Sequence, residues 1–167
     1  MSEGPPGGPD SRRENSGDGP GRLPGGSDPE PGGPADGADT HQLYKRGLDL
    51  LDRGSPAAAA QVLQRAATAE PRSRSVREAL ARAQFDAGQY AAAAGNFRMI
   101  VEASPSDDYA QFGLGLALAR TGDHGGAAEH LALAAAMRPN LRHYTDALRS
   151  VRATLRARRE MRQGRQE

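Results

Sequence analysis

The side chains that most often carry out chemistry are scarce in this chain, and their spacing forms no known site. The sequence has no cysteine, which excludes disulfides, thiolate metal ligands and a cysteine nucleophile. The histidines do not stand in HExxH or a comparable metal-ligand spacing. They are His41, His124, His130 and His143. We therefore expect no metal site.

Signatures of phosphate binding and of nucleophilic catalysis are also missing. The stretch GLGLALARTG, residues 113–122, contains glycines, but a repeat in the sequence accounts for them as close-packing and turn positions. No GxSxG pattern marks a nucleophile elbow. The sequence thus predicts a protein that is not an enzyme and that uses no cofactor.

An arginine stripe near the C-terminus is the clearest concentration of charge. Its members recur at helical spacing: Arg149, Arg152, Arg156 and Arg159. Residues 142–167 contain eight basic and three acidic residues, a net charge of +5, whereas the whole chain carries +1. Such a stripe is typical of a surface for nucleic acid or an acidic partner. No aromatic residues interleave with it for base stacking, so nucleic acid is the weaker interpretation.

A solvated helix face explains the stripe about as well, because the chain uses arginine almost throughout. Lys45 is the only lysine among 22 basic residues. Together with abundant alanine, glycine and proline, this usage indicates a GC-rich bacterial genome.

Residues 1–39 differ in composition from the rest of the chain. They contain eleven glycines, eight prolines, three basic and eight acidic residues, a net charge of −5. Such a segment buries too little apolar surface to offset the backbone ordering entropy of about 1–2 kcal/mol per residue. We expect a disordered acidic tail that serves as a spacer or solubilising segment, followed by a folded domain from Thr40.

The sequence also bears on the compartment. No run of residues is apolar over the roughly 20 positions that a membrane-spanning helix needs. The start, MSEGPPGGPD, lacks the basic and then apolar regions of a secretory signal. We expect a cytoplasmic protein that does not bind membranes.

A sequence pattern repeats at one fixed interval along the chain, and it indicates the elements that position the side chains described above. Three glycines stand 34 positions apart, and each precedes an alanine-rich segment: Gly54, Gly88 and Gly122. Three of the four prolines beyond the tail share the interval: Pro71, Pro105 and Pro139. The same register aligns a column of small residues, a column of large ones and a second small column: Ala59, Ala93 and Ala127; Leu63, Phe97 and Leu131; Gly47, Ala81 and Gly115.

Each unit of this repeat is predicted to contain two helices joined by a glycine turn. In the first unit we expect helices over Gln42–Arg53 and Pro56–Ala69. Gly54 takes the positive φ that ends the first helix, and Ser55 with Pro56 begins the second. The small residues let the paired helices approach closely, and the large column fills the space between them.

On these residues the chain resembles the tetratricopeptide repeat family, whose repeat unit has this length and this pattern. Three units fit, residues 40–73, 74–107 and 108–141. The resemblance implies an all-α fold, a right-handed α-solenoid of three helix pairs. In residues 142–167 one apolar stripe predicts a capping helix from about Leu141 to Glu160, followed by a short tail.

The resemblance also implies a binding surface, because the first helix of every unit lines a concave groove in this family. Carried onto this sequence, the inward positions are Tyr44, Leu48, Leu51, Glu78, Arg82, Phe85, Tyr109, Phe112 and Leu116. Aromatic residues clustered in a concavity are usual anchors of a binding site. We expect an extended or helical peptide with apolar anchors.

Chaperone-binding members of the family hold a terminal carboxylate with a clamp of lysine and asparagine. The matching places here are Tyr44, Leu48, Ala79, Tyr109 and Gly113, so a chaperone-tail ligand is not expected. The sequence therefore predicts a non-enzymatic scaffold or adaptor that binds a protein or peptide partner, as a monomer or weak homo-oligomer. An acidic partner or nucleic acid at the arginine stripe stands as the alternative.

Overall fold

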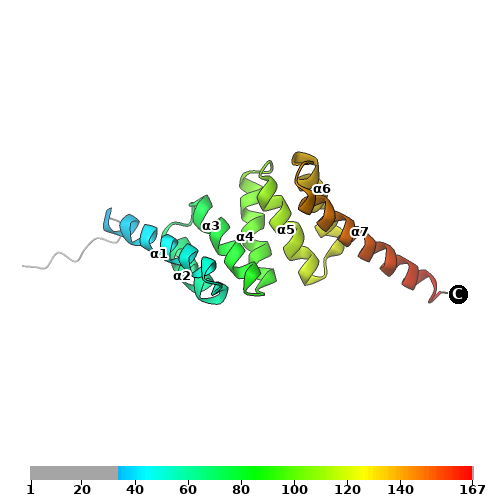
Figure 1. Ribbon diagram of the computed structural model, residues 1–167, viewed down its shortest axis with the longest axis horizontal. Helices are drawn as coiled ribbons and strands as arrows, with labels where there is room; N and C mark the ends of the chain where they lie inside the picture. The colour runs from blue at the N-terminus through cyan, green and yellow to red at the C-terminus, as the bar shows by residue number, and fades with distance from the viewer. Residues whose placement is uncertain (1–33, 167) are drawn as a thin grey trace, which may run out of the picture. The chain divides into compact units, whose positions relative to one another are not determined.

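The computed structural model describes residues 34–166, and this part of the chain contains α-helices and no strand (Figure 1). The helices are α1 (Pro34–Asp52), α2 (Pro56–Ala69), α3 (Arg74–Asp86), α4 (Tyr90–Ala103), α5 (Asp108–Thr121), α6 (His124–Met137) and α7 (Arg142–Gln163). They confirm the predicted all-α solenoid of three helix pairs and a final helix. The part of the predicted disordered tail in residues 1–33 lies outside the described residues.

The first helix begins earlier than the sequence indicated. We expected the tail to extend to Asp39 and the helix to cover Gln42–Arg53, whereas α1 begins at Pro34. Proline is favourable in the first turn of a helix, where its missing N–H needs no partner. Two alanines among residues 34–39 favour the helical state further. The glycine and proline content of the preceding residues concealed this helix start.

A glycine ends the first helix of each pair, as predicted. The φ angles of Gly54, Gly88 and Gly122 are 72°, 78° and 94°, which only glycine adopts without strain. The N–H of the next residue then donates to the carbonyl five residues earlier, at 2.8, 2.8 and 3.0 Å in the three copies. This hydrogen bond satisfies a carbonyl at the helix end and fixes the turn into the second helix.

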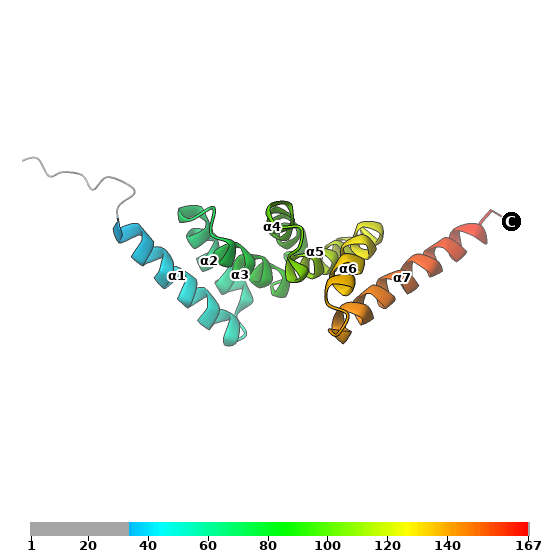
Figure 2. The same ribbon diagram turned by 90° about the horizontal axis from the view of Figure 1, so that it is seen from above.

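The helices form an inner and an outer layer. Each helix packs against the next one in the chain, and Figure 2 shows them following in order from α1 to α7. In addition α1 contacts α3, α3 contacts α5 and α5 contacts α7, whereas α2, α4 and α6 do not contact one another. The first helices of the pairs therefore lie side by side on the inner face, and the second helices are spread apart on the outer face.

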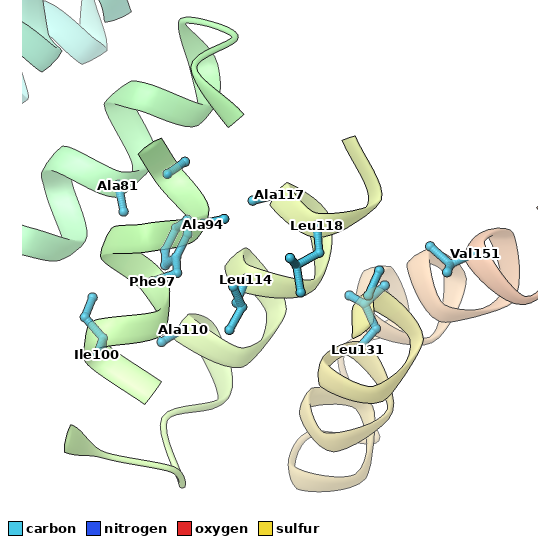
Figure 3. Close-up of a cluster of buried hydrophobic side chains, with 12 residues drawn as sticks. Ala81, Ala94, Phe97, Ile100, Ala110, Leu114, Ala117, Leu118, Leu131 and Val151 are labelled. Carbon is cyan, nitrogen blue, oxygen red and sulfur yellow. The ribbon is translucent and has the colours of Figure 1, made fainter. Parts of the chain in front are cut away.

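The small and large columns pack as predicted, and Figure 3 shows the cluster that they form around α4, α5 and α6. The small column Ala59, Ala93 and Ala127 is fully buried. A Cβ at Gly115 would lie 2.6 Å from Cγ of Leu131, closer than side chains ever approach. Gly47 faces Leu63 in the same way. The glycines therefore allow a leucine of the second helix to lie directly on the backbone of the first.

A second glycine of α5 is explained by the preceding repeat. A Cβ at Gly113 would lie 2.5 to 2.8 Å from three ring atoms of Phe97. One repeat earlier the corresponding residues are Ala79 and Leu63, and both belong to one buried cluster. The larger ring at position 97 thus requires the smaller residue at position 113.

Polar side chains replace part of the apolar core in the middle pair. Asn96 on α4 accepts a hydrogen bond from Arg77 at 3.0 Å and donates one to the buried Gln84 at 2.8 Å. The equivalent contact in the third pair joins Gln111 to His130 at 2.7 Å. No buried side-chain nitrogen or oxygen in residues 34–166 lacks a hydrogen-bond partner. Because these groups have hydrogen-bond partners, the polar residues hold the two helices of each pair together and leave no polar side chain without a partner in the described part of the core.

Helix α7 docks on the third pair through an aromatic stack. The ring of Tyr144 stacks on Phe112 of α5, with 4.3 Å between the centroids. Its hydroxyl donates to Asp108 at 3.0 Å, and burial, with this hydrogen bond second, raises the pKa of Tyr144 to about 12. Val151 is also buried, whereas the residues after Leu155 are exposed. The first half of α7 is therefore part of the fold, and its second half extends beyond α6 (Figures 1 and 2).

Candidate peptide-binding groove

The inner layer carries two adjoining hollows lined by residues of α1, α3, α4 and α5. One is mainly apolar and is lined by Arg82, Phe85, Asp86, Phe97, Tyr109, Phe112, Gly113 and Leu116. The other is more polar and is lined by Tyr44, Leu48, Arg74, Ser75, Glu78, Ala79, Arg82 and Tyr109. Arg82 and Tyr109 line both hollows. The two hollows therefore form one continuous surface, which we call the groove.

The apolar half of the groove is a set of partly buried rings around a close helix contact. Phe85, Phe112 and Leu116 pack with one side against the core and line the hollow with the other. Gly113 lets the buried Phe97 form the floor. Apolar side chains that are already ordered by packing lose little entropy when a ligand covers them.

Tyr109 stands at the junction of the two halves. Its ring meets Phe97 edge to face with centroids 6.1 Å apart, and the side chain remains 37% exposed. Burial is the largest cause that raises the pKa of Tyr109 above its ordinary value, which favours the neutral hydroxyl further. Tyr109 thus offers an apolar ring and a hydroxyl donor at the centre of the groove.

The polar half is held by ion pairs. Arg74 hydrogen-bonds Asp107 through Nε at 2.9 Å and pairs with Glu78 at 3.0 Å. Partial burial raises the pKa of Glu78, and the charge of Arg74 opposes that shift. Arg82 lies 3.9 Å from Asp86, one turn along α3. These ion pairs fix the charged side chains at and beside the polar half, so that they can orient a ligand.

The structure places eight of the nine predicted groove residues on this surface. The exception is Leu51, which is only 9% exposed and packs in the cluster between α1, α2 and α3. It packs there against residues of α2 and α3, whereas Phe85, the equivalent residue one repeat later, lines the groove. We correct that assignment: Leu51 is a core residue.

Two charged groove residues, Arg74 and Asp86, were not predicted from the sequence. Both stand one helical turn from a predicted residue, Arg74 before Glu78 and Asp86 after Arg82. Opposite charges at this spacing share a helix face, so the i, i+4 pattern could have revealed them. Inward positions taken one by one do not reveal such charge pairs.

Some groove positions also have structural roles. Phe112 lines the apolar half and at the same time carries the stack that docks α7. Ala79 and Gly113, at places that match the carboxylate clamp of chaperone-binding relatives, are buried. Neither has a polar side chain that reaches the groove, so a charged clamp has no counterpart at these two positions.

The arginine stripe lies apart from the groove on α7. Arg149, Arg152, Arg156 and Arg159 are exposed. Arg149 pairs with Asp146 at 2.8 Å, and the other three form no ion pair with any residue in 34–166. Within the same range no group of histidine, aspartate and glutamate could hold a metal ion, and no helix is long and apolar enough to cross a membrane.

Comparison with solved structures identifies similar folds at low sequence identity. The first tetratricopeptide repeat domain of Spaghetti (RPAP3), bound to the HSP90 peptide SRMEEVD, is 19% identical with a TM-score of 0.65, and the match covers 71% of this chain and 94% of that one. The Sgt2 tetratricopeptide repeat domain from Aspergillus fumigatus is 20% identical with a TM-score of 0.66, covering 72% and 82%. MamA from Desulfovibrio magneticus is 19% identical with a TM-score of 0.62, covering 77% and 78%.

Comparison by sequence gives the family. No curated protein matches the chain. The tetratricopeptide repeat family matches residues 44–108 and 79–142, two overlapping stretches that together span more than half of the chain. The regular repeat interval, the paired helices and the glycine turns agree with this match. The chain belongs to the tetratricopeptide repeat family.

Proposed function

We propose that this protein is a non-enzymatic interaction module that binds a peptide segment of a partner protein in the groove. The observation that carries the proposal is the continuous surface shared by α1, α3 and α5, with apolar rings at one end and paired charges at the other. A peptide that places one or two large apolar side chains against Phe85 and Tyr109 fits this surface. The principal anchors are Tyr44, Leu48, Phe85, Tyr109 and Phe112.

The composition of the groove favours an apolar anchor over a terminal carboxylate. The Spaghetti domain was solved with an HSP90 peptide that ends in EEVD. In our chain the carboxylate-clamp places carry tyrosine, leucine, alanine and glycine, and the nearby Arg74 is already paired with Asp107 and Glu78. A chaperone tail would find no lysine or asparagine at these places to hold its carboxylate, so we propose a different peptide class.

A pair of alanine variants tests the proposal with little risk to the fold. Arg82→Ala with Tyr109→Ala removes the two exposed residues that line both hollows. Arg98→Ala with Leu133→Ala is the matched control, because it removes the same charge and a similar apolar area from exposed outer-layer positions of α4 and α6.

The full chain and both variants are used to capture partners from the organism that encodes the protein, and bound material is quantified by mass spectrometry. The groove variant should lose about tenfold or more of its captured partner, as expected for anchor residues. The outer-layer variant should retain it. Equal capture by the wild type and a folded groove variant would contradict the proposal.

A further inference from the structure

The exposed face of α7 is made of the residues that stand 34 positions after the face of α5 that packs on α6. In α5 this face contains Gln111, Gly115 and Leu118. Gln111 bonds His130 of α6, Gly115 accepts Leu131, and a Cβ at Gly126 would meet Leu118 at 3.3 Å. The residues 34 positions later are Thr145, Arg149 and Arg152. In residues 34–166 no helix follows α7 to cover them.

The uncovered face is hollowed and partly apolar. Thr145, Leu148 and three arginines, Arg149, Arg152 and Arg156, line a shallow hollow on it. Leu148 and Leu155 pack against the core on one side and remain partly exposed along the edge of the arginine stripe. The face therefore combines a leucine edge with a row of cations.

The change from Gly115 to Arg149 determines what can pack there. A leucine like Leu131 cannot approach the backbone of α7, because the arginine side chain occupies that space. A carboxylate can instead pair with the guanidinium groups on this face, because arginine presents a planar fork of donors to it. Arg152 and Arg156 present the same kind of donor further along the helix. Neither is paired with an acid among the described residues.

We propose that this face of α7 is a docking surface for an acidic amphipathic helix of a partner protein. The helix would cover the face of α7 that corresponds to the α6-covered face of α5, but at a greater distance from the backbone. Its carboxylates would lie toward Arg152 and Arg156, and toward Arg149 in place of its present partner Asp146. Its apolar side chains would lie over Leu148 and Leu155. This surface is separate from the groove, and the inference does not depend on the groove function.

A helical partner explains the face better than nucleic acid does. The register is that of a helix–helix contact, and the leucine edge has no use in phosphate binding. Tyr144, the one tyrosine of α7, is buried against Phe112 and is not available to stack on a base.

The test uses the full chain and a fluorescein-labelled synthetic helix with glutamates at i, i+3 and i+7 and leucines along one edge. Arg152→Glu with Arg156→Glu reverses the charge at two positions of this face. Arg65→Glu with Arg98→Glu is the control, because it changes the net charge equally at exposed positions of α2 and α4, away from α7. Both are read by fluorescence anisotropy, with a DNA duplex of mixed sequence as a second probe.

We expect the wild type to bind the acidic helix, the stripe variant to lose about tenfold or more in affinity, and the control to lose less than about threefold. A helix with lysines in place of glutamates should bind the stripe variant better than the wild type. Equal losses in both variants, or no binding by the wild type up to about 1 mM, would overturn the proposal. Tighter, stripe-dependent binding of the DNA duplex would overturn it in favour of a polyanion site.

Discussion

Helices α5 and α7 occupy equivalent places in the repeat, but only α5 is followed by a partner helix in the described part of the chain. In α5 the register position holds Gly115, and the backbone is open to Leu131 of α6. In α7 the same position holds Arg149, which is exposed and paired with Asp146. The difference shows that the residue at this position decides whether a leucine can lie directly on the helix backbone, while the other face of both helices keeps its apolar character.

The largest effect is expected from copying the arginine of α7 into α5. Gly115→Arg places a charged side chain where Leu131 now packs, and it leaves that charge without a partner. We expect a loss of at least about 3 kcal/mol in the free energy of unfolding, measured by urea denaturation. A loss below about 1 kcal/mol would show that the small column does not control the packing of α6.

The second prediction concerns Gly113 and Phe97. Gly113→Ala should cost about 1–2 kcal/mol, because displacement of the Phe97 ring outweighs the gain in helix propensity. Adding Phe97→Leu recreates the pair found one repeat earlier, Ala79 with Leu63, and should recover most of that loss. A double-mutant cycle in urea measures the coupling, and strict additivity of the two changes would contradict this account of the contact.

The third prediction uses the buried tyrosine that holds α7. The pKa of Tyr144 in the folded state is about 12, above its ordinary value of 10. The folded protein therefore holds the phenol proton more tightly, and this contribution to stability is full below pH 10 and is lost as the pH rises to about 12. Tyr144→Phe should cost about 0.5–1.5 kcal/mol at pH 7 through the lost bond to Asp108.

The same variant should show a flatter loss of stability between pH 10 and about pH 12 than the wild type. Thermal unfolding followed by circular dichroism at several pH values measures both effects. If the two proteins lose stability in parallel over that range, the hydroxyl of Tyr144 does not couple the docking of α7 to pH.

A small effect is expected from the reverse exchange, Arg149→Gly in α7. The position is exposed, so the substitution removes a surface ion pair and some helix propensity, about 1 kcal/mol together. Urea denaturation of both variants, Arg149→Gly and Gly115→Arg, compares their losses in the free energy of unfolding. A cost similar to that of Gly115→Arg would mean that the face of α7 is packed rather than open.

The sequence predicted the fold well because the fold depends on local, periodic features. The glycines at 54, 88 and 122 and the column of Ala59, Ala93 and Ala127 need only their shared interval to be recognised. The start of α1 was missed because composition averages over a segment, whereas a helix start depends on a few residues near Pro34.

The candidate site was predictable only in part. Inward positions follow from the register, which is why eight of nine lie on the groove. Register alone does not show that equivalent positions can pack differently: Leu51 lies in the core, whereas Phe85 one repeat later lines the groove. It also does not show contacts between repeats, such as the stack of Phe112 on Tyr144.

The central claim is that a partner peptide lies in the groove, and site-specific photocrosslinking tests it most directly. A benzophenone amino acid replaces Tyr109, which is exposed where the two hollows meet, or Leu133, which is exposed on the outer layer. Each full-length protein is irradiated with its captured partner, and the adducts are identified by mass spectrometry. The account predicts adducts to one segment of the partner from position 109 and none to that segment from position 133. Adducts from position 133 alone would place the partner on the outer layer and contradict the account.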